Sequence, residues 1–143
     1  MTEKANETTT IEKTVRIAAS PETLWQFWTD PARLVEWWGG EAEVVTEPGG
    51  LFRVVMESGP VMRGTFTELE PPHRLVFTFG WEHNADGEAL APGSTRVEVT
   101  LTPDGRETVL VLRHLDVPTS HASDHDKGWT YLVGERLAAA AAA

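Results

Sequence analysis

The segment Ser20–Gly40, SPETLWQFWTDPARLVEWWGG, decides the fold of this chain. It holds four of the six tryptophans in the sequence, together with two helix-start signals. In Ser20-Pro21 and in Asp30-Pro31, the side-chain oxygen of the first residue can cap free backbone N–H groups, and proline fits the first helical position. The segment therefore predicts two short helices in tandem, each with a heavy aromatic load.

The two predicted helices cover residues 21–28 and 31–38. Gly39 and Gly40 end the second one, since glycine adopts the left-handed conformation of a helix end at little cost. Two tandem helices between a first strand and a long run of strands are typical of a lid on a curved sheet. A sheet with such a lid can enclose a cavity.

Alternating apolar and polar residues predict strands on both sides of this segment. The predicted strands cover residues 11–17, 41–46, 51–57, 61–69, 74–82, 95–102 and 107–115. A last helix runs from about residue 120 to the C-terminus, and its alanine run at 138–143 has so little to pack against that we expect it to fray. Antiparallel strands with helices at both ends of the sequence give an α+β fold class.

Length and composition limit the classes of protein to consider. A chain of 143 residues favours a single domain, which we place at residues 11–143 after a disordered tail at residues 1–10. The absence of cysteine excludes disulfides, thiolate metal sites and cysteine nucleophiles. With 12 basic and 22 acidic residues, the net charge of −10 disfavours nucleic acid and anionic membranes as partners. The sequence shows neither a transmembrane stretch nor a signal-peptide core, so we expect a cytoplasmic protein without membrane contact.

Four segments of the chain resemble one known family. They are ASPETLWQFWTDPARLVEWWGG, GTFTELEPPHRLVFTFGW, STRVEVTLTPDGRETVLVLRH and HDKGWTYLVGERL. Over residues 11–137 the chain resembles the stand-alone bacterial relatives of the activator of the heat-shock-protein-90 ATPase, in the SRPBCC or START-like superfamily. The resemblance implies the helix-grip fold, in which a curved antiparallel sheet of about six to seven strands wraps around a long C-terminal helix, with two short helices after the first strand.

The same resemblance implies an apolar cavity between the sheet and the C-terminal helix. Members of the superfamily bind lipids, sterols, polyketides and other hydrophobic or amphipathic small molecules there, and we expect such a small molecule as the partner. One alternative is a cyclase- or hydrolase-like enzyme that uses the same cavity. A second alternative is an interaction protein that activates a chaperone ATPase, although the chain has no room for the additional N-terminal domain of the eukaryotic co-chaperone. The sequence is also compatible with a homodimer.

Side-chain alternation along the strands predicts which residues face the cavity. The same register turns Arg53, Arg63, Arg96 and Arg113 outward, as charged side chains require. The predicted cavity residues are Trp25, Trp28, Trp37, Trp38, Phe52, Val54, Met56, Met62, Phe66, Phe77, Phe79, Trp81, Val97, Val99, Leu110, Leu112, His114, Trp129, Leu132 and Val133. From the residues alone, such aromatic positions are more often packed core than cavity lining, and the family resemblance is what favours a cavity for the set as a whole.

His114 is the one polar side chain that this register places inward on a core strand. It is a candidate hydrogen-bonding anchor or general base, or else a buried histidine with satisfied partners. His121 and His125 lie four residues apart on the last helix and could join His114 in a zinc-like ligand set. Ligand spacing alone is a weak signal, and no paired carboxylates or nucleophile motif is apparent. We therefore expect no metal, no cofactor and no catalytic residue apart from the candidate His114.

Overall fold

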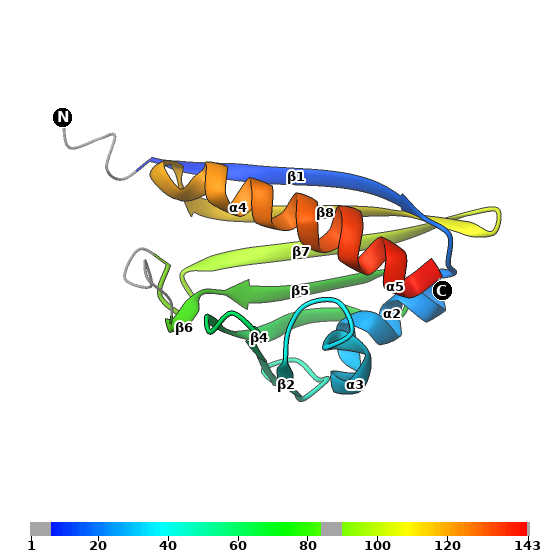
Figure 1. Cartoon of the computed structure of the whole chain (residues 1–143), viewed down its shortest axis with the longest axis horizontal. Helices are drawn as coiled ribbons and strands as arrows, with labels where there is room; N and C mark the ends of the chain where they lie inside the picture. Colours follow the sequence, from blue (N-terminus) through cyan, green and yellow to red (C-terminus); the bar gives the residue numbers. More distant parts are fainter. Residues whose placement is uncertain (1–6, 84–89, 143) are drawn as a thin grey trace.

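The computed structural model describes residues 7–83 and 90–142 of the chain. It is an α+β structure in which one curved antiparallel sheet carries a long C-terminal helix across one face (Figure 1). The strands are β1 (Thr8–Ile17), β2 (Glu41–Val44), β3 (Leu51–Val55), β4 (Val61–Glu70), β5 (Arg74–Phe79), β6 (Trp81–His83), β7 (Thr95–Asp104) and β8 (Glu107–Pro118). Along the sheet their order is β1-β8-β7-β5-β4-β3-β2, and β6 pairs with β4.

The helices lie at both ends of the chain. They are α2 (Pro21–Thr29), α3 (Pro31–Leu34), α4 (Thr119–Tyr131) and α5 (Ala138–Ala142), and a π-helical segment, η1 (Leu132–Leu137), joins the last two. The α4–η1–α5 helix crosses the sheet diagonally, and its C-terminal end lies near α2 (Figure 1). The helix-grip architecture expected from the sequence is confirmed.

Both helix caps predicted from the tryptophan-rich segment are present. Ser20 Oγ accepts a hydrogen bond from the backbone N–H of Thr23 at 3.2 Å, and Asp30 Oδ1 accepts one from that of Ala32 at 3.0 Å. Proline occupies the first turn after each cap. The two helices therefore begin where the sequence predicts, because the caps depend on local chemistry alone.

The predicted extent of the second helix, residues 31–38, is wrong, because α3 ends at Leu34. The chain continues in tighter turns, in which the N–H of Trp37 donates to the carbonyl of Leu34 at 3.3 Å. The Trp37 indole nitrogen donates to the carbonyl of Phe27 on α2 at 2.8 Å, and both Trp37 and Trp38 are buried. The helix ends here because the hydrogen bond from Trp37 to α2 and the burial of both indoles stabilise the chain more than a further helical turn would.

Gly39 is required for space and not for a left-handed helix end. It does not belong to the described glycines with positive φ, which are Gly49, Gly59, Gly93 and Gly105. A Cβ atom on Gly39 would lie 2.8 Å from Val54 Cγ1 and 2.8 Å from the carbonyl oxygen of Val55. The sequence analysis was right that this position needs glycine, but its reason, a left-handed helix end, was wrong.

Several strand boundaries also differ from the prediction. The strand predicted over residues 74–82 breaks at Gly80, between β5 and β6, where a Cβ atom would overlap the carbonyl of Ala91. The strands predicted at 41–46 and 51–57 are each two residues shorter at their C-terminal ends. β7 runs on to Asp104 and β8 to Pro118, because the paired partner strands continue there.

The two ends of the chain are better packed than predicted. β1 begins at Thr8, which pairs with Pro118, so the strand reaches into the segment predicted to be a disordered tail. Residues 1–6 of that tail lie outside the described residues. In α5, Ala141 is buried and Ala138 and Ala140 pack on the core, with contacts to β1 and α2. The expectation that the alanine run 138–143 frays is therefore wrong for residues 138–142.

Gly64 on β4 offers a test of this close packing. A Cβ atom there would overlap the backbone carbonyl of Thr78 on β5, whereas a Cβ atom on Gly134 of η1 meets nothing within 4 Å. We expect Gly64→Ala to lower the free energy of unfolding by about 3 kcal/mol or more. Gly134→Ala, the control, should raise it by about 0.5–1 kcal/mol, because alanine favours helix. Urea unfolding monitored by circular dichroism measures both, and equal stability of the two variants would contradict the packing.

Candidate functional site

A pocket of about 250 Å³ opens between the sheet and the C-terminal helix. The sheet, the turn after α3 and the neighbouring loops contribute Trp38, Met56, Pro60, Phe79, Trp81 and Leu90. The helix contributes His121, Asp124, His125, Gly128, Trp129 and Leu132. The helix residues recur at spacings of three and four, so they occupy one helical face, the one turned toward the sheet.

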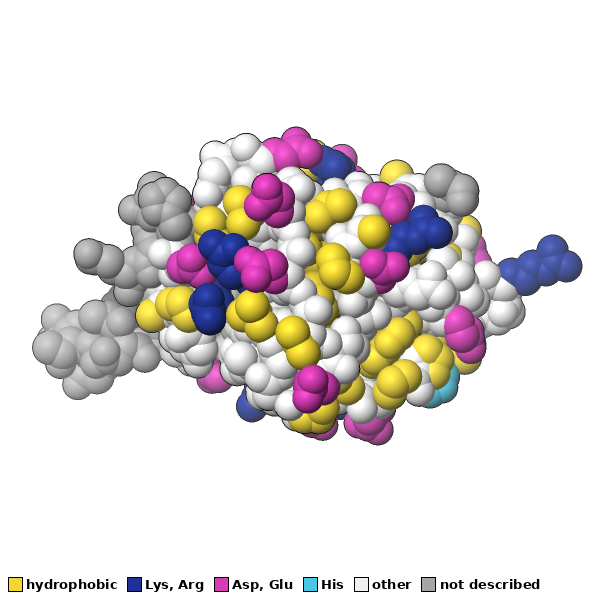
Figure 2. Space-filling view, turned by 90° about the horizontal axis from the view of Figure 1, so that it is seen from below, with side chains coloured by type: hydrophobic (Ala, Val, Ile, Leu, Met, Phe, Trp, Pro, Cys, Tyr) yellow, Lys and Arg dark blue, Asp and Glu magenta, His cyan; other side chains and the backbone are white. Residues whose placement is uncertain are grey.

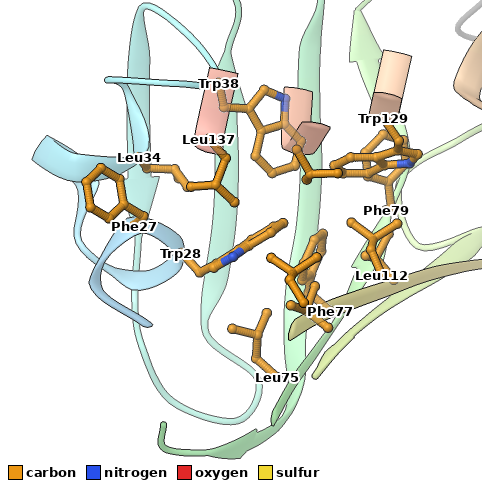
Figure 3. Close-up of a cluster of buried hydrophobic side chains, with 14 of the residues drawn as sticks. Phe27, Trp28, Leu34, Trp38, Leu75, Phe77, Phe79, Leu112, Trp129 and Leu137 are labelled. Carbon is orange, nitrogen blue, oxygen red and sulfur yellow. The ribbon is translucent and has the colours of Figure 1, made fainter. Parts of the chain in front are cut away.

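Aromatic rings form the walls of this pocket. Trp38 stacks on Phe79 with ring centroids 6.4 Å apart and an interplanar angle of 14°. Trp129 meets Trp38 edge-on at 5.4 Å, and Trp81 meets Phe79 in the same way at 5.4 Å. Figure 3 shows the side chains of Trp38, Phe79 and Trp129 close to one another. Such packed rings make a rigid apolar surface.

His125 fixes the position of Trp81, one of the aromatic residues that line the pocket. The indole N–H of Trp81 donates to His125 Nε2 at 3.1 Å, and His125 Nδ1 donates to the carbonyl of His121 one turn earlier on α4 at 2.9 Å. Because Nε2 accepts and Nδ1 donates, these partners assign the hydrogen of the neutral ring to Nδ1. The Trp81 ring is thereby fixed against the helix, and both nitrogens of His125 are occupied.

His114 is buried behind the pocket and does not line it. Its Nδ1 accepts from the indole N–H of Trp129 at 3.0 Å, and its Nε2 lies 2.8 Å from Thr95 Oγ1. Thr95 Oγ1 donates in turn to the carbonyl of Phe79 at 2.6 Å, so His114 Nε2 carries the hydrogen that it donates to Thr95. Of the two interpretations of His114, this geometry supports the buried histidine with satisfied partners.

Burial lowers the pKa of His114 from its ordinary value of 6.5 to about 3, and nearby His125 adds a smaller effect in the same direction. The ring is therefore neutral at physiological pH. A base whose two nitrogens are both engaged, and whose pKa lies this low, is badly suited to proton abstraction near neutrality. Its geometry instead orients Trp129, which does line the pocket.

The three histidines do not form a metal centre in the described part of the chain. The rings of His114 and His125 lie 5.8 Å apart, but all four of their nitrogens take part in hydrogen bonds. Across residues 7–83 and 90–142, no group of three or more His, Asp or Glu side chains could hold a metal ion.

The structure divides the predicted cavity residues into a pocket set and a core set. The members that line the pocket are Trp38, Met56, Phe79, Trp81, Trp129 and Leu132. The members that fill the core beneath it are Trp28, Phe52, Val54, Met62, Phe66, Phe77, Val97, Val99, Leu110, Leu112, His114 and Val133. Trp25 is half-buried on α2 and packs against that core.

Sequence reasoning missed several lining residues, namely Pro60, Leu90, Asp124 and Gly128. It considered His121 and His125 only as metal ligands. The helix members among these residues share the periodicity of Trp129 and Leu132, which was the available signal. They were overlooked because they are polar or small, whereas the search followed the apolar stripe.

A second pocket of about 240 Å³ lies beside the first. Trp38, Met56 and Leu132 line both pockets and so form the partition between them. Trp37, another predicted cavity residue, lines this second pocket together with Tyr131 and Arg136. The π-helical segment begins at Leu132, on the partition itself, and such segments often occur at functional sites.

Comparison with known proteins gives consistent matches. The family model described as Activator of Hsp90 ATPase homolog 1-like protein matches residues 18–142. An AHSA1-like protein from Rhizobium etli is 36% identical, with a TM-score of 0.72, and the match covers 94% of this chain and 83% of that one. No curated protein matches.

Two further solved structures share the fold. DynU16, from the dynemicin biosynthetic locus, is 26% identical with a TM-score of 0.76, and the match covers 91% of this chain but 46% of DynU16, so this chain spans about half its length. An HSP90 activator from Plasmodium falciparum is 25% identical with a TM-score of 0.70, over 87% of this chain and 91% of that one. In the described ranges, no helix is long and apolar enough to cross a bilayer.

The low pKa of His114 predicts a pH dependence of stability. The unfolded chain binds a proton near pH 6.5 and the folded chain only near pH 3, so the unfolded state holds more protons between these values. The free energy of unfolding should therefore fall, as pH drops through this window, by about 1.4 kcal/mol per pH unit from this residue. Above the window this residue adds no pH dependence.

Urea unfolding at a series of pH values through the window measures this slope. His114→Gln keeps hydrogen-bonding groups but cannot titrate, so its slope should be shallower by the His114 contribution. A variant that is folded and keeps the full wild-type slope would contradict the assignment.

Proposed function

The chain belongs to the family of Activator of Hsp90 ATPase homolog 1-like proteins, and on this premise we propose that it binds a small, mostly apolar molecule in the pocket between its sheet and its C-terminal helix. The observation that carries the proposal is the pocket itself. Four aromatic side chains line it, and they leave an open space between the sheet and the helix. Concave, mostly apolar pockets with a few placed polar groups are the usual form of small-molecule sites.

The volume of the pocket limits the size of the ligand. Drug-sized ligands occupy pockets of roughly 300–1,000 Å³, and a cavity of about 150 Å³ suffices for benzene. At about 250 Å³ the pocket suits a body of one or two rings. Among the ligand types expected from the sequence, this favours a small aromatic fragment of the polyketide kind over a sterol or a long lipid.

Binding is favoured over catalysis by the state of the histidines. His114 is neutral, enclosed and outside the pocket lining, and the nitrogens of His125 are both engaged. A cyclase or hydrolase would need a free acid or base directed at its substrate. The described lining also contains Asp124, which is exposed, and His121, which is half-buried, so both side chains contact solvent and are less suited to chemistry at a buried ring.

Activation of a chaperone ATPase is a second candidate function, supported by the similarity to the Plasmodium falciparum HSP90 activator. Figure 2 shows one face of the molecule, on which acidic, basic and apolar side chains are interspersed. Among the described ion pairs, Arg53 pairs with Glu43 and with Glu82, each at 2.9 Å. Mixed ion pairs of this kind do not make the single-sign patch that would steer a charged partner. If the chain has this function, adding it to purified Hsp90 should raise the ATPase rate, and an unchanged rate would remove the candidate.

A matched pair of helix variants tests the proposed pocket. Gly128 lines the pocket and Gly134 does not, and a Cβ atom on either meets nothing within 4 Å. We expect Gly128→Leu to fill the pocket and to cost about 1–3 kcal/mol of binding free energy, hence roughly five- to 150-fold in affinity. Gly134→Leu should bind as the wild type does. Thermal shift against a panel of one- and two-ring aromatic molecules supplies the ligands, and tryptophan fluorescence titration supplies the affinities.

Native mass spectrometry of freshly purified protein complements this comparison, since it shows any co-purified small molecule and separates monomer from homodimer. A panel without hits, together with a ligand-free mass, would contradict the proposal. Hits whose affinity survives Gly128→Leu would place binding elsewhere and contradict it equally.

A further inference from the structure

Aromatic rings surround the main pocket, which lies between the sheet and the C-terminal helix. The rings of Trp38 and Phe79 are nearly parallel, with an interplanar angle of 14°. Trp129 is inclined at 65° to Trp38, and Trp81 at 83° to Phe79. Trp81 is half-buried and the other three are buried, so Trp81 exposes the largest share of its ring. Rings that border one space at crossed angles have the arrangement of an aromatic cage, which binds cations over the ring faces.

The charge of the lining has one sign. The described lining contains one carboxylate, that of Asp124 on α4, and neither lysine nor arginine. Asp126, two residues later on the same helix, pairs with Lys13. No ion pair joins Asp124 to a lysine or arginine within the described ranges. The Asp124 carboxylate therefore stays available to a positively charged ligand.

The second pocket differs in exactly this respect, because Arg136 contributes to its lining and not to that of the main pocket. The Arg136 guanidinium donates to the hydroxyl of Tyr131 at 3.3 Å. An anionic ligand would meet a cation in the second pocket but none in the described lining of the main one. The net charge of −10 on the whole chain likewise favours the approach of cations.

Hydrogen bonding restricts the kind of cation that fits. An ammonium group with N–H donors needs acceptors when it leaves water, since each unpaired donor costs free energy. Both ring nitrogens of His125 are already engaged, with the Trp81 indole and with the carbonyl of His121. A quaternary ammonium group has no N–H donor, so its burial among aromatic rings leaves no donor unpaired. The lining therefore suits a quaternary ammonium better than a primary one.

We propose that the ligand of the main pocket is an organic cation, in which a body of one or two rings carries a quaternary ammonium group. The inference rests on the proposed function and names its ligand class. Trp81 and Asp124 determine the specificity for the cation, because Trp81 offers the most exposed ring of the cage and Asp124 supplies the opposite charge. Asp124 directly precedes His125, whose ring lies 6.1 Å from that of Trp81, so both groups belong to the same side of the pocket.

A pair of probes of equal shape separates the charge from the apolar contacts. Phenyltrimethylammonium carries a positive nitrogen where tert-butylbenzene carries a carbon, and the two molecules are otherwise alike. Cation–π contact corresponds to a preference of about fivefold or more for the cation in the wild type. Without recognition of the charge, tert-butylbenzene binds at least as tightly, because the cation must shed its hydration. Tryptophan fluorescence titration measures both affinities.

A first pair of variants tests the carboxylate. Asp124→Asn and Glu135→Gln each remove one negative charge from an exposed position on the C-terminal helix, but only Asp124 lines the pocket. Asp124→Asn should lower the cation-to-neutral affinity ratio by about two- to fivefold, as the loss of a partly solvated ion pair does. Glu135→Gln should leave the ratio unchanged, which controls for the overall charge of the protein.

A second pair tests the aromatic ring. Trp81 and Trp25 are both half-buried, and only Trp81 lines the pocket. Trp81→Leu keeps an apolar side chain without a π face, so it should lower the cation-to-neutral ratio by about fivefold. Trp25→Leu should leave it unchanged. The ratio cancels general losses of stability or of pocket shape, since these weaken both probes together.

The outcomes separate this inference from the proposed function. If tert-butylbenzene binds as tightly as the cation, or if either Asp124→Asn or Trp81→Leu leaves the ratio unchanged, the inference is overturned while the proposed function stands. Cation affinity that survives Gly128→Leu would place the cation outside the pocket and overturn it too. If neither probe binds the wild type, the inference also falls, and the panel of aromatic molecules decides the proposed function.

Discussion

A chain of three hydrogen bonds fixes the C-terminal helix on the sheet, and the pocket depends on it. The chain runs from the Trp129 indole on α4 to His114 on β8, then to Thr95 on β7, and ends at the carbonyl of Phe79 on β5. These groups are buried, so the loss of one link leaves a polar atom unpaired away from water, which costs more than a single hydrogen bond gains. The side chains of Trp129, His114 and Thr95 therefore set the distance between the helix and the sheet, which leaves room for the pocket.

The helix covers a packed core at one end of the sheet and a pocket at the other. The reason is that the residues on its inner face change along its length from polar or small to apolar. Along α4 the residues turned toward the sheet include His121, His125 and Gly128, which are too polar or too small to fill the space. From Trp129 onward the inner face holds Val133, Leu137 and Ala141, which are buried. Near α2 and α3 the indoles of Trp28 and Trp37 complete the packing. Sequence order along one helix thus separates the pocket from the packed core.

The parts of the fold that could be predicted depend on local chemistry. Ser20 and Asp30 cap helices wherever the surrounding chain lies, and alternation along strands turns the arginines outward. The parts that were wrong depend on contacts between distant segments. The end of α3 depends on the bond from Trp37 to Phe27. The roles of Gly39 and Gly80 depend on backbone that approaches from other segments, namely β3 at Gly39 and the segment before β7 at Gly80. The site shows the same division, since inward-facing residues were identifiable, but their separation into core and pocket required the position of the helix.

The indoles of the tryptophan-rich segment illustrate why residue type alone does not separate core positions from pocket positions. Trp28, Trp37 and Trp38 are the same residue type in one segment, and all three are buried. Trp37 donates to a backbone carbonyl, whereas the Trp28 indole lies against the rings of Trp37 and Phe77 and its N–H has no partner in the described chain. Only Trp38 combines an unpaired donor with a place in the partition between two pockets. Met56 shares that partition, and its unbranched thioether side chain adapts easily to a neighbour's shape. The partition between the two pockets thus combines one rigid aromatic side chain, Trp38, with one adaptable side chain, Met56.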